Sequence, residues 1–401
     1  EESMRVYLIG VGMGNPATLT LEAKAAIEES KVLIGAPRLL EPYQGRDCRA
    51  LIAADDVAQA IAGVNEGPVG VLLSGDVGFY SGAKKLRERL DGYEVRAFPG
   101  ISSLSYFCAQ LGVSWQDVHI VSAHGRTHNA LGEITSHSRT FLLTGGATLA
   151  QDICKTLKDH GLGALTVSVG ERLSYPEQRI CTGTAAELAE QTFESLAVML
   201  VENPNPVVRT STAPGIPDSA FQRGKAPMTK EEVRTLVLSK LRPQAHHVVW
   251  DVGAGTGSVS IECALACPAG WVYAVEKEEP ALELLEENRQ RFGVCNLTAV
   301  PGRAPEALKA LPAPDRVFLG GTAGTMEASL TAALEKNPAL RVVATAVTLE
   351  TLAESVRVFE AKGLQDVDIV QIAVTRTRQV GPYHMMDANN PVWIISGEGR
   401  A

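Results

Sequence analysis

The sequence predicts an α/β fold, organised as two α/β units in tandem. Apolar runs of strand length alternate with amphipathic helical patterns through most of the 401 residues. In each half one apolar run breaks into alternating glycines, "IGVGMGNP" from Ile9 and "DVGAGTGS" from Asp251. Residues 203–228 contain five prolines and show neither periodicity, which is typical of a linker. The chain is long enough for each unit to bury its own core.

The first half is predicted to alternate strands and helices between residues 4 and 206. "MRVYLIGVG" reads as a buried strand, and "TLTLEAKAAIEES" after it reads as an amphipathic helix. The remaining apolar runs predict further strands over residues 31–35, 69–76, 93–100, 118–125, 139–146, 164–171 and 195–204.

The second half restarts the alternation after a linker that we place at residues 207–227. "MTKEEVRTLVLSKL" predicts a helix over 228–241, and each half is expected to fold alone because the linker offers few means of packing. Strands are predicted over 247–253, 271–276, 296–300, 315–321, 340–347, 366–377 and 391–397. The last two have no crossover helix between them and are expected to form an antiparallel hairpin at the sheet edge.

Charge and cysteine usage exclude several classes of function. The net charge of −9 argues against a nucleic-acid or anionic-membrane binder, although a local basic pocket for an acidic substrate remains compatible with it. The seven cysteines include no C-x-x-C pair, and no metal-binding pattern is evident. Apolar runs are too short to span a membrane, and no signal peptide is found. We expect free thiols, no metal and a cytoplasmic protein.

The spacing of the second glycine loop favours one cofactor class. Gly253, Gly255 and Gly257 follow G-x-G-x-G instead of the dinucleotide pattern G-x-G-x-x-G. Asp251 would repel a pyrophosphate but attract an ammonium or a sulfonium, and S-adenosylmethionine carries both. Glu276 ends the next strand, where an acid accepts hydrogen bonds from ribose hydroxyls, and the loop Gly302–Arg303–Ala304 could border the adenine.

Here the second half becomes similar to a known family. "MTKEEVRTLVLSKL", "DVGAGTGSVSIECA", "VYAVEKEEPALELLEENRQRFGV", "VPGRAPEAL" and "DRVFLGGT" resemble the decarboxylating precorrin methyltransferases of cobalamin biosynthesis. That family methylates carbon 15 of a corrin precursor and removes carbon dioxide from the ring C acetate. The resemblance implies a class I Rossmann-like methyltransferase over residues 228–401. Together with Asp251, its cofactor contacts would be Thr229, Gly253, Ala254, Gly255, Thr256, Gly257, Glu276 and Ala304.

The first glycine loop lacks the acid that a class I fold needs, because Gly35 stands at the end of the next strand. "LLSGDVGFYSG", "FPGISSL", "SAHGR", "FLLTGG", "GERLSYPEQR" and "VENP" resemble the tetrapyrrole methylase family over residues 4–206, in the branch that methylates carbon 5. The resemblance implies two α/β lobes with S-adenosylmethionine between them. Val77 stands where the family has proline, and "GMGNP" replaces "GPGDP". The expected cofactor residues are Gly10, Gly12, Gly14, Gly75, Asp76, Val77, Phe79, Ser102 and Ser103.

The order of the two families in one chain implies a bifunctional methyltransferase with two S-adenosylmethionine sites. It would methylate precorrin-6Y at carbons 5 and 15 and decarboxylate the ring C acetate to give precorrin-8X. Its partner would be a polycarboxylate tetrapyrrole, and identical chains could associate by analogy with related methylases. The rival hypotheses are a nicotinamide-dependent tetrapyrrole reductase and a tetrapyrrole carrier with one decayed half. Asp251 argues against the former, and the two intact glycine loops argue against the latter.

Methyl transfer needs mainly alignment and a proton acceptor, so the candidate catalytic residues are few. In "SAHGRTHN", His124 is a candidate acid or base, and Arg126 could clamp a substrate carboxylate with its fork of donors. A polar loop histidine is the alternative for His124. In the second half the candidates are Arg303, Tyr383 and His384, the last two in "TRTRQVGPYHMMDANNP". A solvated strand face is the alternative for the arginines of that segment.

Overall fold

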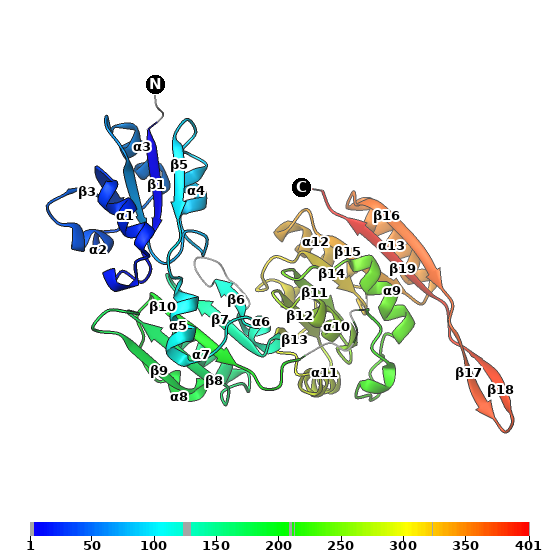
Figure 1. Cartoon of the computed structure of the whole chain (residues 1–401). Coiled ribbons are helices and arrows are strands. Elements are labelled where there is room, and N and C mark those ends of the chain that lie inside the picture. The colour runs from blue at the N-terminus through cyan, green and yellow to red at the C-terminus, as the bar shows by residue number, and fades with distance from the viewer. Residues whose placement is uncertain (1–3, 123–129, 208–210, 212, 323, 401) are drawn as a thin grey trace. The chain divides into compact units, whose positions relative to one another are not determined.

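The computed structural model describes residues 4–122, 130–207, 211, 213–322 and 324–400 (Figure 1). His124 and Arg126 lie outside the described residues. The chain divides into two compact units, one of residues 1–126 and 139–202 and the other of residues 127–138 and 203–401. Parallel sheets with flanking helices build both units, which confirms the predicted fold class.

The first lobe of the first unit is a five-stranded parallel sheet in the order β3-β2-β4-β1-β5. Helices cover both of its faces, since one apolar cluster includes side chains of α3 and α4 and another includes those of α1 and α2. The carboxyl ends of its strands meet at one edge, where the glycine loop lies. The elements are β1 (Arg5–Gly10), α1 (Leu21–Glu29), β2 (Val32–Gly35), α2 (Pro37–Leu40), β3 (Asp47–Ala50), α3 (Ala54–Ala62), β4 (Val69–Leu73), α4 (Ala83–Arg87) and β5 (Glu94–Phe98).

The second lobe is a five-stranded mixed sheet in the order β6-β7-β10-β8-β9. Only β6 and β7 run parallel among its pairs. Sequence periodicity missed two short strands of this unit, β3 and β9. The elements are α5 (Ser103–Leu111), β6 (His119–Ser122), β7 (Arg139–Leu143), α7 (Ala150–Asp159), β8 (Thr166–Glu171), β9 (Arg179–Thr184), α8 (Ala185–Leu188) and β10 (Ala197–Glu202).

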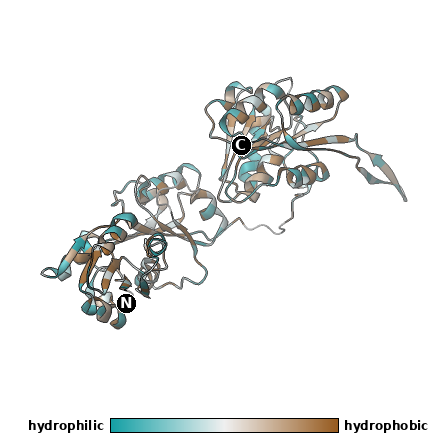
Figure 2. Cartoon of the chain, turned by 90° about the horizontal axis from the view of Figure 1, so that it is seen from above, coloured by the Kyte–Doolittle hydropathy of each residue, from teal (hydrophilic) through white to brown (hydrophobic). Residues whose placement is uncertain are grey.

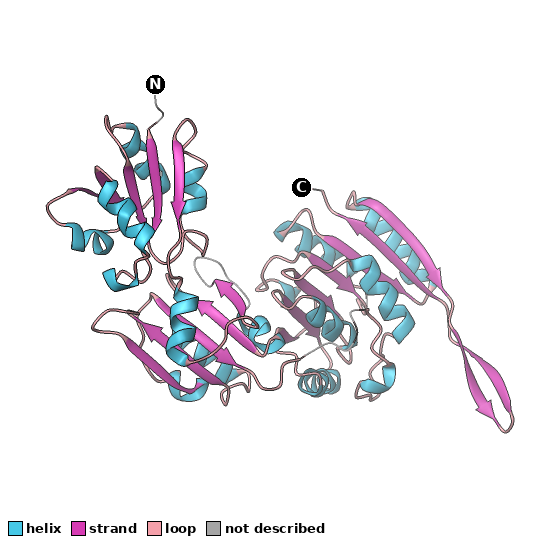
Figure 3. Ribbon diagram, viewed as in Figure 1, coloured by secondary structure: helices cyan, strands magenta, loops and turns pink. Residues whose placement is uncertain are grey.

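The second unit is built on a seven-stranded sheet in the order β13-β12-β11-β14-β15-β19-β16. In this sheet β19 runs in the opposite direction to the other six strands. Figure 3 shows helices on both faces of this sheet. Helices α9 and α10 contribute to the apolar cluster on one face, and α12 and α13 contribute to the cluster on the other. The apolar residues gather along the strands in Figure 2.

The elements of the second unit begin with α6 and resume after residue 203. They are α6 (Ala130–Ser136), α9 (Glu231–Leu241), β11 (Val248–Val252), α10 (Ser258–Ala266), β12 (Trp271–Glu276), α11 (Glu279–Arg291), β13 (Leu297–Pro301), β14 (Arg316–Leu319), α12 (Met326–Lys336), β15 (Arg341–Ala346), α13 (Leu349–Ala361), β16 (Gln365–Ile372), β17 (Thr375–Val380), β18 (Tyr383–Ala388) and β19 (Val392–Glu398). Among the described residues, no helix is both long and apolar enough to cross a membrane.

The segment expected to be an unpacked linker is packed against the second unit over residues 215–224. Phe221 is 4% exposed and belongs to the apolar cluster beneath α9 and α10. The backbone N–H of Gly215 donates to Glu262 Oε1 at 2.8 Å, and Gln222 exchanges two hydrogen bonds with Asn288. The expectation of few packing contacts was wrong because a single aromatic residue and backbone hydrogen bonds anchor a segment that has no periodicity.

The end of the chain also differs from the prediction. The predicted strand over 366–377 is two strands, β16 and β17, and an additional two-stranded hairpin of β17 and β18 stands between β16 and β19. β16 and β19 are antiparallel neighbours at the sheet edge, as expected. The inserted hairpin extends away from the body of its unit, and every side chain of β17 and β18 is exposed (Figure 1).

Candidate active sites

A cavity of about 760 Å³ opens at the carboxyl edge of the parallel strands β11 to β15 in the second unit. It lies where ligands bind in open α/β sheets, in the crevice beyond the strand ends. The cavity brings together seven of the residues predicted for this half. They are Thr229, Gly253, Ala254, Gly255, Glu276, Arg303 and Ala304.

Glu276 is held by the backbone around it. One carboxylate oxygen accepts from the N–H of Gly255 at 2.9 Å, and the other accepts from Lys277 and Glu278 at 2.7 and 2.9 Å. The residue is 7% exposed and lines the cavity. Within the described residues Oε2 accepts only the bond from Gly255, so one lone pair of the carboxylate remains to accept from a ligand hydroxyl. Glu276 therefore fixes the glycine loop and presents an anion to the cavity.

Two glycines of the loop are required by close approaches of backbone. A Cβ on Gly253 would lie 2.6 Å from the carbonyl oxygen of Gly321, in the loop after β14. A Cβ on Gly255 would lie 2.8 Å from the carbonyl oxygen of Pro227. Both glycines also have positive φ, which other residues rarely adopt. The absent side chains let three segments close around one cavity.

Asp251 is buried behind this loop and is not part of the cavity wall. Its side chain is 0% exposed, with Oδ2 accepting a hydrogen bond from Ser260. Oδ1 has no hydrogen-bond partner among the described residues. Burial raises the pKa of the Asp251 carboxyl to about 7, against the lowering effect of the Ser260 hydroxyl and with a further rise from the charge of Glu276. Thr256 and Gly257 are likewise buried outside the cavity wall, so these three residues support the loop from beneath.

Sequence analysis missed much of the opposite wall. Lys225, Ala226 and Pro227 come from the end of the predicted linker, and Met228 opens the segment predicted as the first helix of this half. The segment "LGGT" after β14 was noticed as part of a resemblance, but its glycines were not assigned to the site. The missed lining residues also include Thr322, Thr325, Thr345, Val347 and Val392. The glycines directly after the buried strand β14 were the one feature of the sequence that could have assigned this segment to the site.

Tyr383 and His384 lie elsewhere. Both are on the exposed hairpin of β17 and β18, and Tyr383 is 72% exposed. Neither is among the residues that line the cavity within the described part of the chain. Arg376, on the paired strand, forms ion pairs with Glu231 and Glu232 at the start of α9. Of the catalytic residues predicted for this half, Arg303 therefore lies at the cavity, whereas Tyr383 and His384 do not line it.

In the first unit, three loops meet at the carboxyl edge of the parallel sheet. The N–H of Gly12 donates to the carbonyl of Gly75 at 3.1 Å, and that of Gly75 donates back at 2.6 Å. A Cβ on Gly10 would lie 2.7 Å from the nitrogen of Gly100. The predicted residues Gly10, Gly12 and Gly75 are therefore neighbours, with the loop after β5 beside them.

Asp76 and Ser102 have structural partners at this edge. Asp76 accepts from the N–H groups of Gly100 and Gly78 at 3.0 and 2.9 Å. Ser102 caps α5 by accepting from Ser105 N–H at 3.1 Å, and Ser103 begins the helix. Asp76 therefore ties the loop after β4 to the loop after β5, and α5 starts directly beside them.

The remaining predicted residues of the first unit connect this edge to its core. Val77 packs against the apolar cluster of the first lobe. Phe79 lies 6.2 Å from Phe141 of the second lobe, between ring centroids. A Cβ on Gly14 would lie 2.0 Å from the hydroxyl oxygen of Tyr175, which is buried and has no hydrogen-bond partner among the described residues. Tyr175 was missed, although it stands in the noted motif "GERLSYPEQR".

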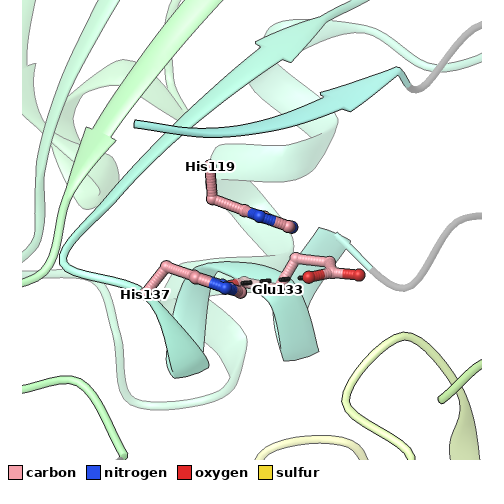
Figure 4. A group of neighbouring side chains, drawn as sticks. All are labelled: His119, Glu133 and His137. Atoms are coloured by element: carbon pink, nitrogen blue, oxygen red, sulfur yellow. Dashed lines mark hydrogen bonds and ion pairs between the residues drawn. The ribbon is translucent and has the colours of Figure 1, made fainter. Parts of the chain in front are cut away.

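Glu133 on α6 and His137, the residue directly after that helix ends, are neighbours in the second unit. Figure 4 shows Glu133 and His137 one helical turn apart, with Nδ1 of His137 3.8 Å from Glu133 Oε2 and 2.7 Å from the Glu133 carbonyl oxygen. His119, also drawn, belongs to the other unit. Two side chains offer fewer protein ligands than the three or four of a typical zinc site.

The fold and the sites define a class: an α/β protein of two units, each with a glycine loop at the carboxyl ends of parallel strands. Residues 5–189 match the family described as "Tetrapyrrole (Corrin/Porphyrin) Methylases", and residues 219–397 match the "Precorrin methyltransferase domain". The chain is 33% identical over 356 residues to a precorrin-6Y C(5,15)-methyltransferase [decarboxylating] from Sinorhizobium sp, covering 86% of this chain and 84% of that protein.

Two further relatives match the second half. A probable cobalt-precorrin-6B C(15)-methyltransferase (decarboxylating) from Pyrobaculum calidifontis is 46% identical over 186 residues, which is 46% of this chain and 95% of that protein. A solved precorrin-6y C5,15-methyltransferase from Geobacter metallireducens is 39% identical, with a TM-score of 0.45, and covers 47% of this chain and 98% of that one. The chain belongs to the family of decarboxylating precorrin-6Y C(5,15)-methyltransferases and is an S-adenosylmethionine-dependent methyltransferase.

Proposed function

We propose that the chain methylates precorrin-6Y at carbons 5 and 15 and decarboxylates its ring C acetate, giving precorrin-8X. Residues 4–206 would methylate carbon 5, and residues 228–401, with the packed segment before them, would methylate carbon 15 and release carbon dioxide. Two S-adenosylmethionine sites would serve the two units. The seven free cysteines are compatible with a reducing cytosol, where we place the enzyme.

The observation that carries the proposal is the cavity of the second unit. Its volume of about 760 Å³ is within the range of pockets that bind a molecule of the size of a nucleotide cofactor. Glu276 lines it with an anion suited to ribose hydroxyls. The spacing of Gly253, Gly255 and Gly257 departs from the dinucleotide pattern, which argues against the nicotinamide-dependent alternative.

S-adenosylmethionine, when bound, supplies an electrophilic methyl group. The chain's own work is then to hold cofactor and macrocycle in line, an effect of proximity worth up to about 7–11 kcal/mol of barrier. Glu276 and the glycine loop would fix the cofactor, while Arg303 would orient a substrate carboxylate through its planar fork. The conjugated macrocycle itself accepts the electrons that decarboxylation releases, and a protonated group then returns a proton to carbon.

Two matched glycine substitutions in the full chain test the division of labour. Gly10→Ala would place a Cβ 2.7 Å from Gly100 in the first unit, and Gly253→Ala would place one 2.6 Å from Gly321 in the second. The products are analysed by mass spectrometry. We expect Gly253→Ala to yield substrate with one added methylene and no loss of carbon dioxide. We expect Gly10→Ala to yield substrate that has lost carbon dioxide and gained one methylene.

Release of carbon dioxide by the Gly253→Ala variant would refute the assignment of decarboxylation to the second unit. Circular dichroism spectra matching the wild type are required of both variants, so that a failure to fold is not mistaken for a lost site. Addition of a nicotinamide nucleotide should change neither product.

A further inference from the structure

The mouth of the cavity in the second unit carries cations without carboxylate partners. Lys225, Lys230 and Arg303 line the cavity, and their side chains are exposed. Within the described residues, none of the three forms an ion pair, whereas the nearby Lys277 lies 3.3 Å from Glu278. Many other cations of this acidic chain are paired at the surface, for instance Lys240 with Asp368. The cavity therefore presents positive charge that the protein does not neutralise.

Apolar side chains are exposed at the same mouth, at Val347, and in the segment that follows it along the chain, at Leu349. Val347 lines the cavity just after β15 and is 69% exposed, and Leu349 begins α13 two residues later and is 75% exposed. Val392, at the start of β19, also lines the cavity. Aliphatic side chains this exposed at the rim of a pocket are typical of a ligand-binding surface.

A ligand complementary to this mouth has an apolar face and an anionic periphery. We propose that the mouth is the macrocycle subsite of the second unit, in which Lys225, Lys230 and Arg303 bind peripheral carboxylates of the tetrapyrrole and Val347 and Leu349 contact its face. The inference rests on the proposed function and adds to it the residues that select the substrate.

The cationic and the aliphatic side chains of the mouth would contribute to binding in different ways. Exposed ion pairs are weak singly, so the three cations orient the ring by where they meet its carboxylates more than by the strength of any one bond. The aliphatic contacts are insensitive to salt and contribute affinity through buried apolar area. Lys225 precedes Met228, so the segment between the two halves itself provides part of the subsite.

The test uses the full-length protein and uroporphyrin, a porphyrin with carboxylates around its whole edge, as the probe. Binding is followed by the porphyrin's absorbance at several salt concentrations. Hydrogen–deuterium exchange with and without the probe locates the binding to peptides that contain residues 222–230, 301–305 and 345–350. The variants are Lys225→Gln, Lys230→Gln, Arg303→Gln, the triple variant, and Val347→Ser with Leu349→Ser.

Each single cation variant should weaken binding at this site about two- to fivefold, and the triple variant more than about tenfold. The triple variant should also flatten the salt dependence, because fewer charges remain to be screened. The aliphatic double variant should weaken binding and leave the salt dependence as in the wild type. Lys309→Gln is the matched control, since Lys309 is exposed in the same unit and does not line the cavity.

Two results would overturn the proposed subsite. In one, the porphyrin still protects the three segments from exchange in the triple variant. In the other, Lys309→Gln weakens porphyrin binding as much as Lys225→Gln does. Binding of S-adenosylhomocysteine is measured in parallel and should change less than about twofold in Lys225→Gln. Failure of the wild type to bind S-adenosylhomocysteine would instead count against the proposed function, so the two failures are distinguishable.

Discussion

At the scale of single residues, Asp251 places a carboxylate where water does not reach it. The folded-state pKa of about 7 lies above the ordinary value of 3.8 because burial disfavours the charged form. Folding therefore favours the protonated carboxyl, and the free energy of unfolding falls as pH rises from about 4 to about 7. Above about pH 7 the free energy of unfolding falls no further on account of Asp251. The difference between the two pKa values corresponds to a total loss of about 4 kcal/mol at most.

Asp251→Asn should remove this pH dependence. At pH 5 the gain in stability of the variant over the wild type should be about 3 kcal/mol smaller than at pH 8, because folded wild type still holds a proton on Asp251 at pH 5. At pH 8 the variant should be more stable by up to about 4 kcal/mol, since it has no buried charge. Urea unfolding of the full chain at both pH values measures this. An equal difference at pH 5 and pH 8 would contradict the assigned pKa.

Glu276 should matter for the cofactor more than for the fold. Glu276→Ala removes a carboxylate that accepts three backbone hydrogen bonds and would accept others from ribose. Charge-assisted bonds of about 1.5–3 kcal/mol imply a loss of about one to two decades in affinity at the second site. Calorimetry with S-adenosylhomocysteine provides the measurement. Glu283→Gln, at an exposed position of α11 that does not line the cavity, should bind as the wild type does.

The residue scale shows what a sequence pattern can and cannot specify. The spacing of Gly253, Gly255 and Glu276 was enough to predict that they meet at one edge of the sheet. It could not show that Asp251 is buried beneath the loop instead of facing the ligand. Lys225 and Val347 were missed because their place at the cavity depends on how distant segments pack.

At the scale of elements, Arg234 joins the segment before α9 to the core. Its guanidinium is 0% exposed, pairs with Glu262 and Asp218, and donates to the carbonyls of Ile216 and Thr229. The ring of Phe221 lies 4.7 Å from its central carbon. A single side chain thus satisfies several groups of a segment that has no regular structure of its own.

Arg234→Met should destabilise the second unit by about 3–5 kcal/mol, because it leaves Glu262 buried without its cation. Thermal unfolding measures the loss, and hydrogen exchange should rise in peptides covering 215–229. Lys240→Met is the comparison, since its partner Asp368 is exposed and such pairs contribute under about 1 kcal/mol. Equal effects of the two substitutions would show that Arg234 has no special role.

Strands and helices were predictable where apolar periodicity is strong, as in β11, β12 and α9. The short strand β3 was missed because none of its four residues is buried, so no apolar alternation marks it. The hairpin of β17 and β18 was missed as a separate element for the same reason: with no buried face, it has no apolar alternation to distinguish it. The segment 215–224 was misjudged because its contacts are made by backbone groups and one aromatic ring.

At the scale of the whole molecule, two differently built glycine loops predict two cofactor sites in one chain. Titration with S-adenosylhomocysteine should saturate at two equivalents, and Gly253→Ala should reduce this to one. Analytical calorimetry of the full chain checks the stoichiometry. Saturation at one equivalent in the wild type would mean that one unit has lost its cofactor, as the carrier hypothesis requires.

The tandem arrangement itself was readable from the sequence, since both glycine loops and the break in periodicity between them are local features. The relatives then identify the combination, which no single motif could. The division of the two chemistries between the units stays a prediction until product masses are measured.

The exposed hairpin has a consequence in oxidation chemistry. Met385 and Met386 on β18 are 48% and 84% exposed, whereas Met199 and Met326 are completely buried in the two units. Peroxide converts accessible thioethers to polar sulfoxides, and burial protects the rest. Mild oxidation should therefore modify the hairpin first and leave Met199 and Met326 unaltered. The sulfoxides would serve as a chemical label for this arm, and any surface that covers it in the cell would slow their formation.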